Sequence, residues 1–123
     1  MSRKKVLVID DDPKNIFALV ATLEAKGYEA ISASSAEEGI KLLLQDEGIG
    51  IVLLDMMMPD MDGYEAISVI RAHETLRVLP LVAVTAQAMK GDQEKCLEAG
   101  ADEYISKPID VDRLIDTLNR YLN

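Results

Sequence analysis

Five short runs of consecutive apolar residues, separated by segments with helical periodicity, limit how this chain can fold more than any other feature. The runs cover residues 6–9, 30–33, 51–54, 81–84 and the shorter 104–105. Continuous rather than alternating apolar character is typical of strands buried on both faces, as in a parallel sheet. We therefore predict a parallel sheet, with the last and shortest run as an edge strand.

Helix start and stop signals follow each run. Asp12 is placed to cap a helix that begins at Pro13, and Ser35 with Glu38 forms a capping box. The sequence predicts five helices: from Pro13 to a stop at Gly27, after Ser35, after Gly63, over residues 92–99 before Gly100, and after Asp110. Alternation of strand and helix predicts an α/β fold with right-handed crossovers, a doubly wound three-layer sandwich.

Length, charge and cysteine content exclude several classes of protein. The 123 residues suit one domain over 1–123, and 13 basic against 22 acidic residues give a net charge of −9. This charge opposes binding to nucleic acid or to an anionic membrane. The single Cys96 excludes an internal disulfide, and with only His73 beside it a His/Cys zinc site is excluded too. No apolar stretch is long enough for a signal peptide or a membrane span, so we expect a cytoplasmic protein.

Polar side chains follow four of the five runs. They are Asp10, Asp11 and Asp12 after the first, Asp55 after the third, Thr85 after the fourth and Lys107 after the fifth. Ligands of open parallel sheets bind beyond the carboxyl ends of the strands, so we expect these groups to meet at one edge. Carboxylates 4–5 Å apart repel by roughly 3–4 kcal/mol, which either raises a pKa or holds a cation. Oxygen ligands of this kind favour Mg²⁺.

A carboxylate cluster, a lysine and a hydroxyl together suit phosphoryl chemistry. Lys107 supplies a fixed positive charge and Thr85 a neutral donor, as a developing phosphoryl dianion requires. The segment DDDPKN after the first run has no glycine-rich phosphate loop, which argues against nucleotide binding there. An aspartate is itself a possible covalent acceptor, and Asp55 is the best candidate because it ends the most apolar central run.

Four motifs in this order resemble one known family over essentially the whole chain. They are VLVIDDD at 6–12, LLDMMMPDMDG at 53–63, VTA at 84–86 and SKP at 106–108. The chain resembles the receiver domain of bacterial two-component response regulators. The stretch TAQAMKGDQEKCLEAGADEYISKP is closest in pattern to receivers of hybrid histidine kinases and of single-domain regulators. The resemblance implies the flavodoxin-like (βα)5 fold with strand order 2-1-3-4-5.

The resemblance also implies a phosphoryl and metal site. It makes Asp55 the phosphoacceptor, which takes a phosphoryl group from the phosphohistidine of a histidine kinase or a histidine phosphotransfer protein. Mg²⁺ would be held by Asp11 directly, by Asp10 through water, by Asp55 and by the backbone carbonyl of Met57. Such a domain catalyses only its own phosphorylation and dephosphorylation and is not otherwise an enzyme.

Further roles follow from the same resemblance. Thr85 and Lys107 match the switch hydroxyl and the lysine that contacts the phosphoryl group, and Tyr104 matches the aromatic residue whose rotamer follows Thr85. Pro108 falls where the family has a cis peptide bond. Met57 and Gln87 flank the path of the water that hydrolyses the phosphoryl group, and the thioether of Met57 cannot orient a water.

Several alternatives stay open at this point. A Mg²⁺-dependent aspartyl-phosphate phosphatase would need a second aspartate where Met57 stands, and a flavodoxin would need a hydroxyl-rich phosphate loop after the first strand. A pseudo-receiver, an interaction module without phosphorylation, would be expected to lack a site residue. Asp10 and Asp11 could also be a solvated helix terminus, and Tyr104 a packing residue. The kinase, the downstream output and any flanking domains are not encoded in these motifs.

Overall fold

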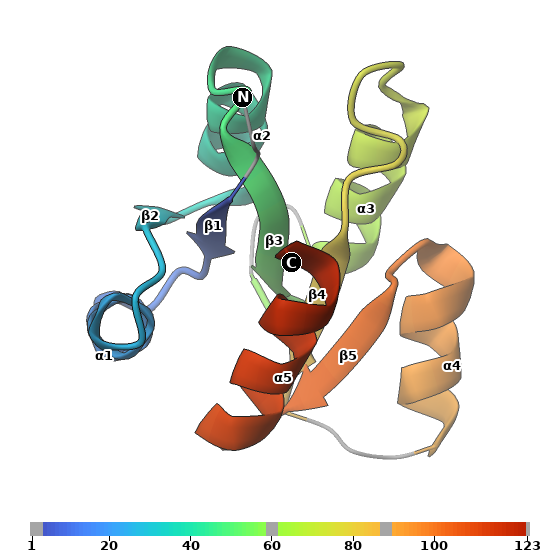
Figure 1. The fold of residues 1–123 in the computed structure, drawn as a ribbon. Helices are drawn as coiled ribbons and strands as arrows, with labels where there is room; N and C mark the ends of the chain where they lie inside the picture. Colours follow the sequence, from blue (N-terminus) through green and yellow to red (C-terminus); the bar gives the residue numbers. More distant parts are fainter. Residues whose placement is uncertain (1–3, 59–61, 87–89, 123) are drawn as a thin grey trace.

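The computed structural model describes residues 4–58, 62–86 and 90–122 and shows five strands that alternate with five helices (Figure 1). The strands are β1 (Lys5–Ile9), β2 (Ala30–Ala33), β3 (Ile49–Asp55), β4 (Leu81–Thr85) and β5 (Glu103–Ser106). The helices are α1 (Pro13–Ala25), α2 (Ala36–Gln45), α3 (Gly63–Ala72), α4 (Lys90–Ala99) and α5 (Val111–Leu122).

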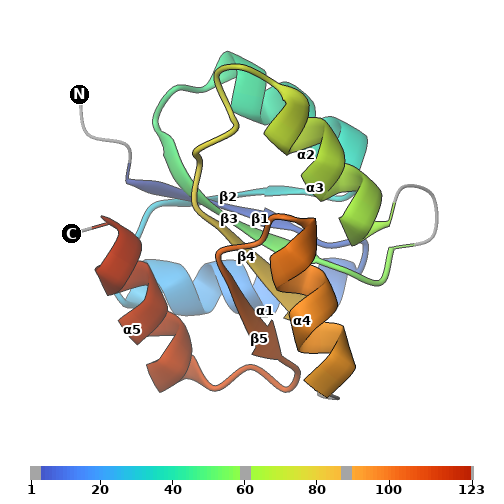
Figure 2. The same cartoon turned by 90° about the vertical axis from the view of Figure 1, so that its right-hand side faces the viewer.

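The strands form one parallel sheet in the order β2-β1-β3-β4-β5, which confirms the predicted topology. Figure 2 shows α2 and α3 on one side of the sheet and α1 with α5 on the other. Helix α4 packs beside α3 and β5 and adds to the core on the α2–α3 side. The sheet is therefore covered on both faces, as the continuous apolar runs predicted.

Two cores lie on the two faces of the sheet, and β3 contributes to both. Its Val52 and Leu54 belong to the core under α2, α3 and α4, whereas Ile51 and Leu53 belong to the core under α1 and α5. All seven residues of β3 are buried. Asp55, the last residue of this strand, is therefore buried together with the apolar residues before it.

The predicted helix caps are present, with two corrections to the boundaries. Asp12 accepts a hydrogen bond from the Lys14 N–H at 2.9 Å, and Ser35 accepts one from the Glu38 N–H at 3.2 Å. Gly63 is the first residue of α3 rather than the one before it, because Asp62 caps the helix by accepting from the Glu65 N–H at 2.9 Å. Helix α4 begins at Lys90 rather than at residue 92, so Gly91 lies inside its first turn.

Gly63 is required by its close approach to β3, and Gly91 is not. A Cβ at Gly63 would lie 2.7 Å from the Met56 Cα, a backbone atom that has no room to move, whereas a Cβ at Gly91 would meet nothing within 4 Å. We expect Gly63→Ala to lower the free energy of unfolding by about 1–3 kcal/mol through overpacking. Gly91→Ala should raise it by up to about 1 kcal/mol because alanine favours the helix. Urea unfolding of the two variants checks this, and equal stabilities would contradict it.

Candidate functional site

Three carboxylates meet at the carboxyl ends of β1 and β3. Asp10 follows β1 and Asp55 ends β3, and both are buried, with 6% and 4% of their surface exposed, whereas Asp11 is exposed. One oxygen of each of the three carboxylates lies within 4.8 Å of the others. The parallel pairing of β1 with β3, with Ile9 opposite Leu54, produces this meeting. The set fits a hard divalent cation, which takes oxygen ligands and keeps some of its water.

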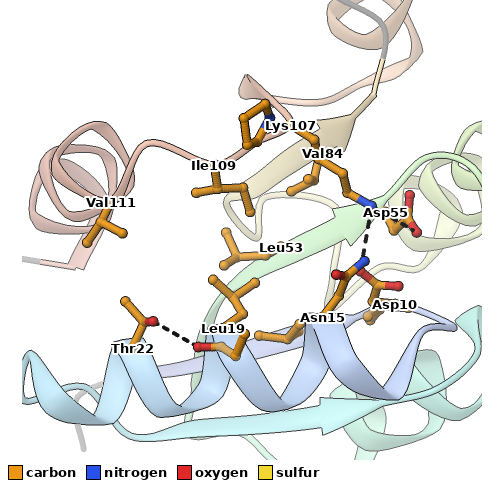
Figure 3. A pocket seen from close by; sticks show the side chains of 14 residues that line it. Asp10, Asn15, Leu19, Thr22, Leu53, Asp55, Val84, Lys107, Ile109 and Val111 are labelled. Carbon is orange, nitrogen blue, oxygen red and sulfur yellow. Dashed lines mark hydrogen bonds and ion pairs between the residues drawn. The ribbon is translucent and has the colours of Figure 1, made fainter.

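Lys107, the residue directly after β5, reaches the two buried carboxylates. Its Nζ lies 3.7 Å from Asp55 Oδ2 and 3.8 Å from Asp10 Oδ2 (Figure 3). Its backbone N–H donates to the Thr85 carbonyl at 2.8 Å, which fixes the start of the loop after β5 against the end of β4. One ammonium faces two carboxylates, so the cluster keeps an excess of negative charge when both are ionised.

Backbone donors fix the orientation of both buried carboxylates. The Met57 N–H donates to Asp55 Oδ1 at 3.0 Å, and the Asp12 N–H donates to Asp10 Oδ1 at 2.9 Å. Burial raises the pKa of the Asp10 carboxyl, and the neighbouring charge of Asp55 adds to the rise, whereas the Asp12 N–H and Lys107 oppose it. The arrangement therefore suits a bound cation, which would relieve this unfavourable charge.

The remaining residues singled out from the sequence lie on β4, on β5 and in the loop after β5. Thr85 is buried at the end of β4, and Tyr104 is half-buried in β5, opposite Ala83. Because strand side chains alternate, Thr85, Ala83 and Tyr104 share one face of the sheet. The Lys107–Pro108 peptide bond is cis, as the resemblance implied.

The methionine-rich segment divides into packing and exposed residues. Met56 and Met58 are buried, whereas Met57 is 58% exposed beside Asp55. That the backbone carbonyl of Met57 binds the metal ion stays a prediction. Met61 and Gln87 lie outside the described residues.

A cavity of about 350 Å³ extends from the cluster between α1 and α5. Figure 3 shows Asn15 and Leu19 of α1 facing Ile109 and Val111 across it, with Leu53 on the sheet side and Asp10, Asp55 and Lys107 at one end. No sequence motif identified Asn15 or Leu19 as residues that line this cavity. The charged site is therefore open on the side of α1 and continues into an apolar hollow.

A parallel sheet of this strand order, with a buried acidic cluster and a lysine at its carboxyl edge, is the arrangement of an α/β signalling domain. The response regulator receiver domain profile matches residues 6–119, and the chain belongs to this family. The polar-differentiation response regulator DivK of Brucella ovis is 38% identical over 119 residues, which cover 97% of this chain and 96% of that protein. The DivK of Brucella anthropi is 36% identical over the same lengths.

Solved structures agree with this assignment. The receiver domain of sensor histidine kinase PA1611 from Pseudomonas aeruginosa, which has magnesium in its active-site cleft, is 31% identical over 98% of both chains, with a TM-score of 0.88. Vibrio cholerae CheY4 is 25% identical over 98% of this chain and all of that one, with a TM-score of 0.89. The chain is thus a phosphoacceptor signalling domain rather than a conventional enzyme. No helix in the described part is long and apolar enough to cross a membrane.

The raised pKa of Asp10 predicts that this carboxylate lowers stability in metal-free solution. A buried acid whose folded-state pKa is raised costs stability above its unfolded-state pKa, and the cost disappears below about pH 4, where both states are protonated. We expect Asp10→Asn to raise the melting temperature at pH 7 by about 4 °C for each 1 kcal/mol of folding stability that it restores. This increase in melting temperature should vanish near pH 3.5. Calorimetry across this pH range measures it. Asp12→Asn, which changes the same charge and keeps the helix cap, is the control, and an equal gain there would refute the prediction.

Proposed function

We propose that Asp55 is the phosphoacceptor of this receiver domain. The observation that carries the proposal is the position of Asp55 at the end of β3, with Oδ1 held by the Met57 N–H and Oδ2 3.7 Å from Lys107 Nζ. A carboxylate oxygen of Asp55 attacks the phosphorus of a phosphohistidine. The O–P bond forms as the N–P bond breaks, and the imidazole takes up a proton from solvent as it leaves. The product is an acyl phosphate on Asp55.

The other charged groups of the site would bind either the metal ion or the phosphoryl group. Asp11 would hold Mg²⁺ directly and Asp10 through water, with Asp55 and the Met57 carbonyl completing the protein ligands. A Mg²⁺ ion held by these residues would neutralise the charge that develops on the phosphoryl oxygens. Lys107 contributes a second positive charge from the β5 side and keeps the nucleophile oriented when the phosphoryl group arrives.

The hydroxyl of Thr85 and the ring of Tyr104 would carry the signal outward. Phosphorylation adds close to two negative charges and strong acceptor oxygens. We infer that these oxygens draw the Thr85 hydroxyl toward Asp55, and that the ring of Tyr104, on the same face of the sheet, changes its rotamer in response. The surface formed by α4, β5 and α5 would then present a different shape to a partner protein.

The donor that fits this chemistry is a histidine kinase or a histidine phosphotransfer protein, in the cytoplasm. The alternative of a phosphatase is disfavoured because Met57, two residues after Asp55, offers no acid or base. The alternative of a pseudo-receiver is disfavoured because the carboxylate cluster and Lys107 are all in place.

The covalent site can be tested directly with a small phosphodonor. Incubation with acetyl phosphate and Mg²⁺ should attach one base-labile phosphoryl group, seen by intact-mass analysis. Asp55→Asn should abolish the adduct because the amide is no nucleophile at neutral pH. Asp62→Asn, which keeps the cap of α3, is a matched control and should be phosphorylated normally. An adduct that persists in Asp55→Asn would refute the assignment.

The exposed side chain of Met57 predicts a long-lived phosphoryl group. Its thioether cannot orient an attacking water and can cover the phosphoryl group. We expect Met57→Asn and Met57→Glu to speed the decay of phosphorylated protein several-fold, because each supplies a group that can hold water. The decay is followed after removal of the phosphodonor, with Val69→Asn, at another exposed apolar position, as the control. Unchanged decay in both Met57 variants would show that the lifetime is set elsewhere.

A further inference from the structure

We propose that Arg113 of α5 is a positioning residue that holds the ring of Tyr104 in the orientation seen here and thereby opposes its movement on phosphorylation. The inference rests on the proposed function of Asp55 and Tyr104. The guanidinium carbon of Arg113 lies 5.4 Å from the centroid of the Tyr104 ring. Its Nη2 also donates to the Tyr104 backbone carbonyl at 3.2 Å.

The position of this guanidinium is set by Tyr104 and not by an acidic partner. Elsewhere in the described chain, Arg71 pairs with Asp102 and Arg120 pairs with Glu103, each at 3.1 Å. Among the described residues, no carboxylate lies within ion-pair distance of Arg113. The Arg113 backbone is itself fixed, since its carbonyl accepts the hydroxyl of the buried Thr117 at 2.9 Å.

The two contacts respond differently to a turn of the Tyr104 ring. The bond to the carbonyl involves the backbone of β5 and survives any change of side-chain rotamer. It keeps the guanidinium at the place where the ring now lies, so a ring that turns away loses the cation–π contact. A contact of this kind at an exposed site favours one conformer by about two- to fivefold. A ligand that binds better to the other conformer is weakened by the same factor.

The test uses beryllofluoride, which mimics the phosphoryl group on an aspartate, with Mg²⁺ and the full chain. Arg113→Gln should bind it about two- to fivefold more tightly than the unmodified protein, because the cost of releasing the ring is removed. Loss of a positive charge disfavours the anion but favours Mg²⁺, so the effect of net charge has to be measured in a charge-matched variant. Arg113→Lys, which keeps the charge but not the planar fork, should lie in between. Arg120→Gln removes a guanidinium from the same helix without touching Tyr104 and should leave affinity unchanged.

A second arm separates ring positioning from a general structural role. In a Tyr104→Leu background, Arg113→Gln should have no effect on affinity, because the double-mutant cycle isolates the pair. In protein labelled with 3-fluorotyrosine, Arg113→Gln should shift the ¹⁹F resonance of Tyr104, identified by its loss in Tyr104→Phe, and Arg120→Gln should not.

Each remaining outcome overturns a definite claim. Equal or weaker binding by Arg113→Gln than by the unmodified protein, or an effect that persists without the Tyr104 ring, would refute the role of Arg113 and leave the proposed function standing. Failure of the unmodified protein to bind beryllofluoride would refute the proposed function, and the role of Arg113 with it.

Discussion

The structure is arranged around two buried carboxylates of like charge held side by side. At 4–5 Å, such groups repel by about 3–4 kcal/mol at an effective dielectric constant near 20. The sheet holds them in place: the Asp10 N–H donates to the Ala33 carbonyl of β2, and the Met56 N–H donates to the Val84 carbonyl of β4. Lys107 offsets one of the two charges. The negative charge that is left over favours a cation at this edge of the sheet.

Much of the fold and the acidic cluster could be predicted because both follow from short-range sequence patterns. Apolar runs identified the strands, and in a parallel sheet the residue after each run is delivered to one edge. That rule alone placed Asp10, Asp55 and Lys107 together, before any resemblance was considered. The strand order is different, since nothing local in the sequence says which strands pair, and it came from the resemblance. The start of α3 was missed by one residue because Asp62 competes with Gly63 as the cap.

Contacts that depend on how a helix is rotated about its axis could not be predicted. The ring contact between Arg113 and Tyr104 joins α5 to an edge strand nine residues earlier, and no periodicity marks it. The residues Ile16, Leu19, Val20 and Leu23 form one apolar stripe along helix α1, yet only Leu23 is buried. Leu19 lines the cavity between α1 and α5, which leaves this part of the stripe uncovered.

The two ends of the β4–β5 pair are joined by different bonds. At the end away from the site, Arg71 donates to the carbonyls of Leu79 and Gly100 and pairs with Asp102, whose carboxylate also accepts the Leu81 N–H at 2.8 Å. Guanidinium bonds to carbonyls and a carboxylate are strong and directional, so β4 and β5 are fixed together where they begin. At the other end, the Lys107 N–H donates to the carbonyl of Thr85 at 2.8 Å, and Thr85 follows Val84, the residue paired with Asp55. The phosphoryl charge that we propose at Asp55 would therefore act on the strand ends that lie away from the Arg71 bonds, on the side of the proposed partner surface formed by α4, β5 and α5.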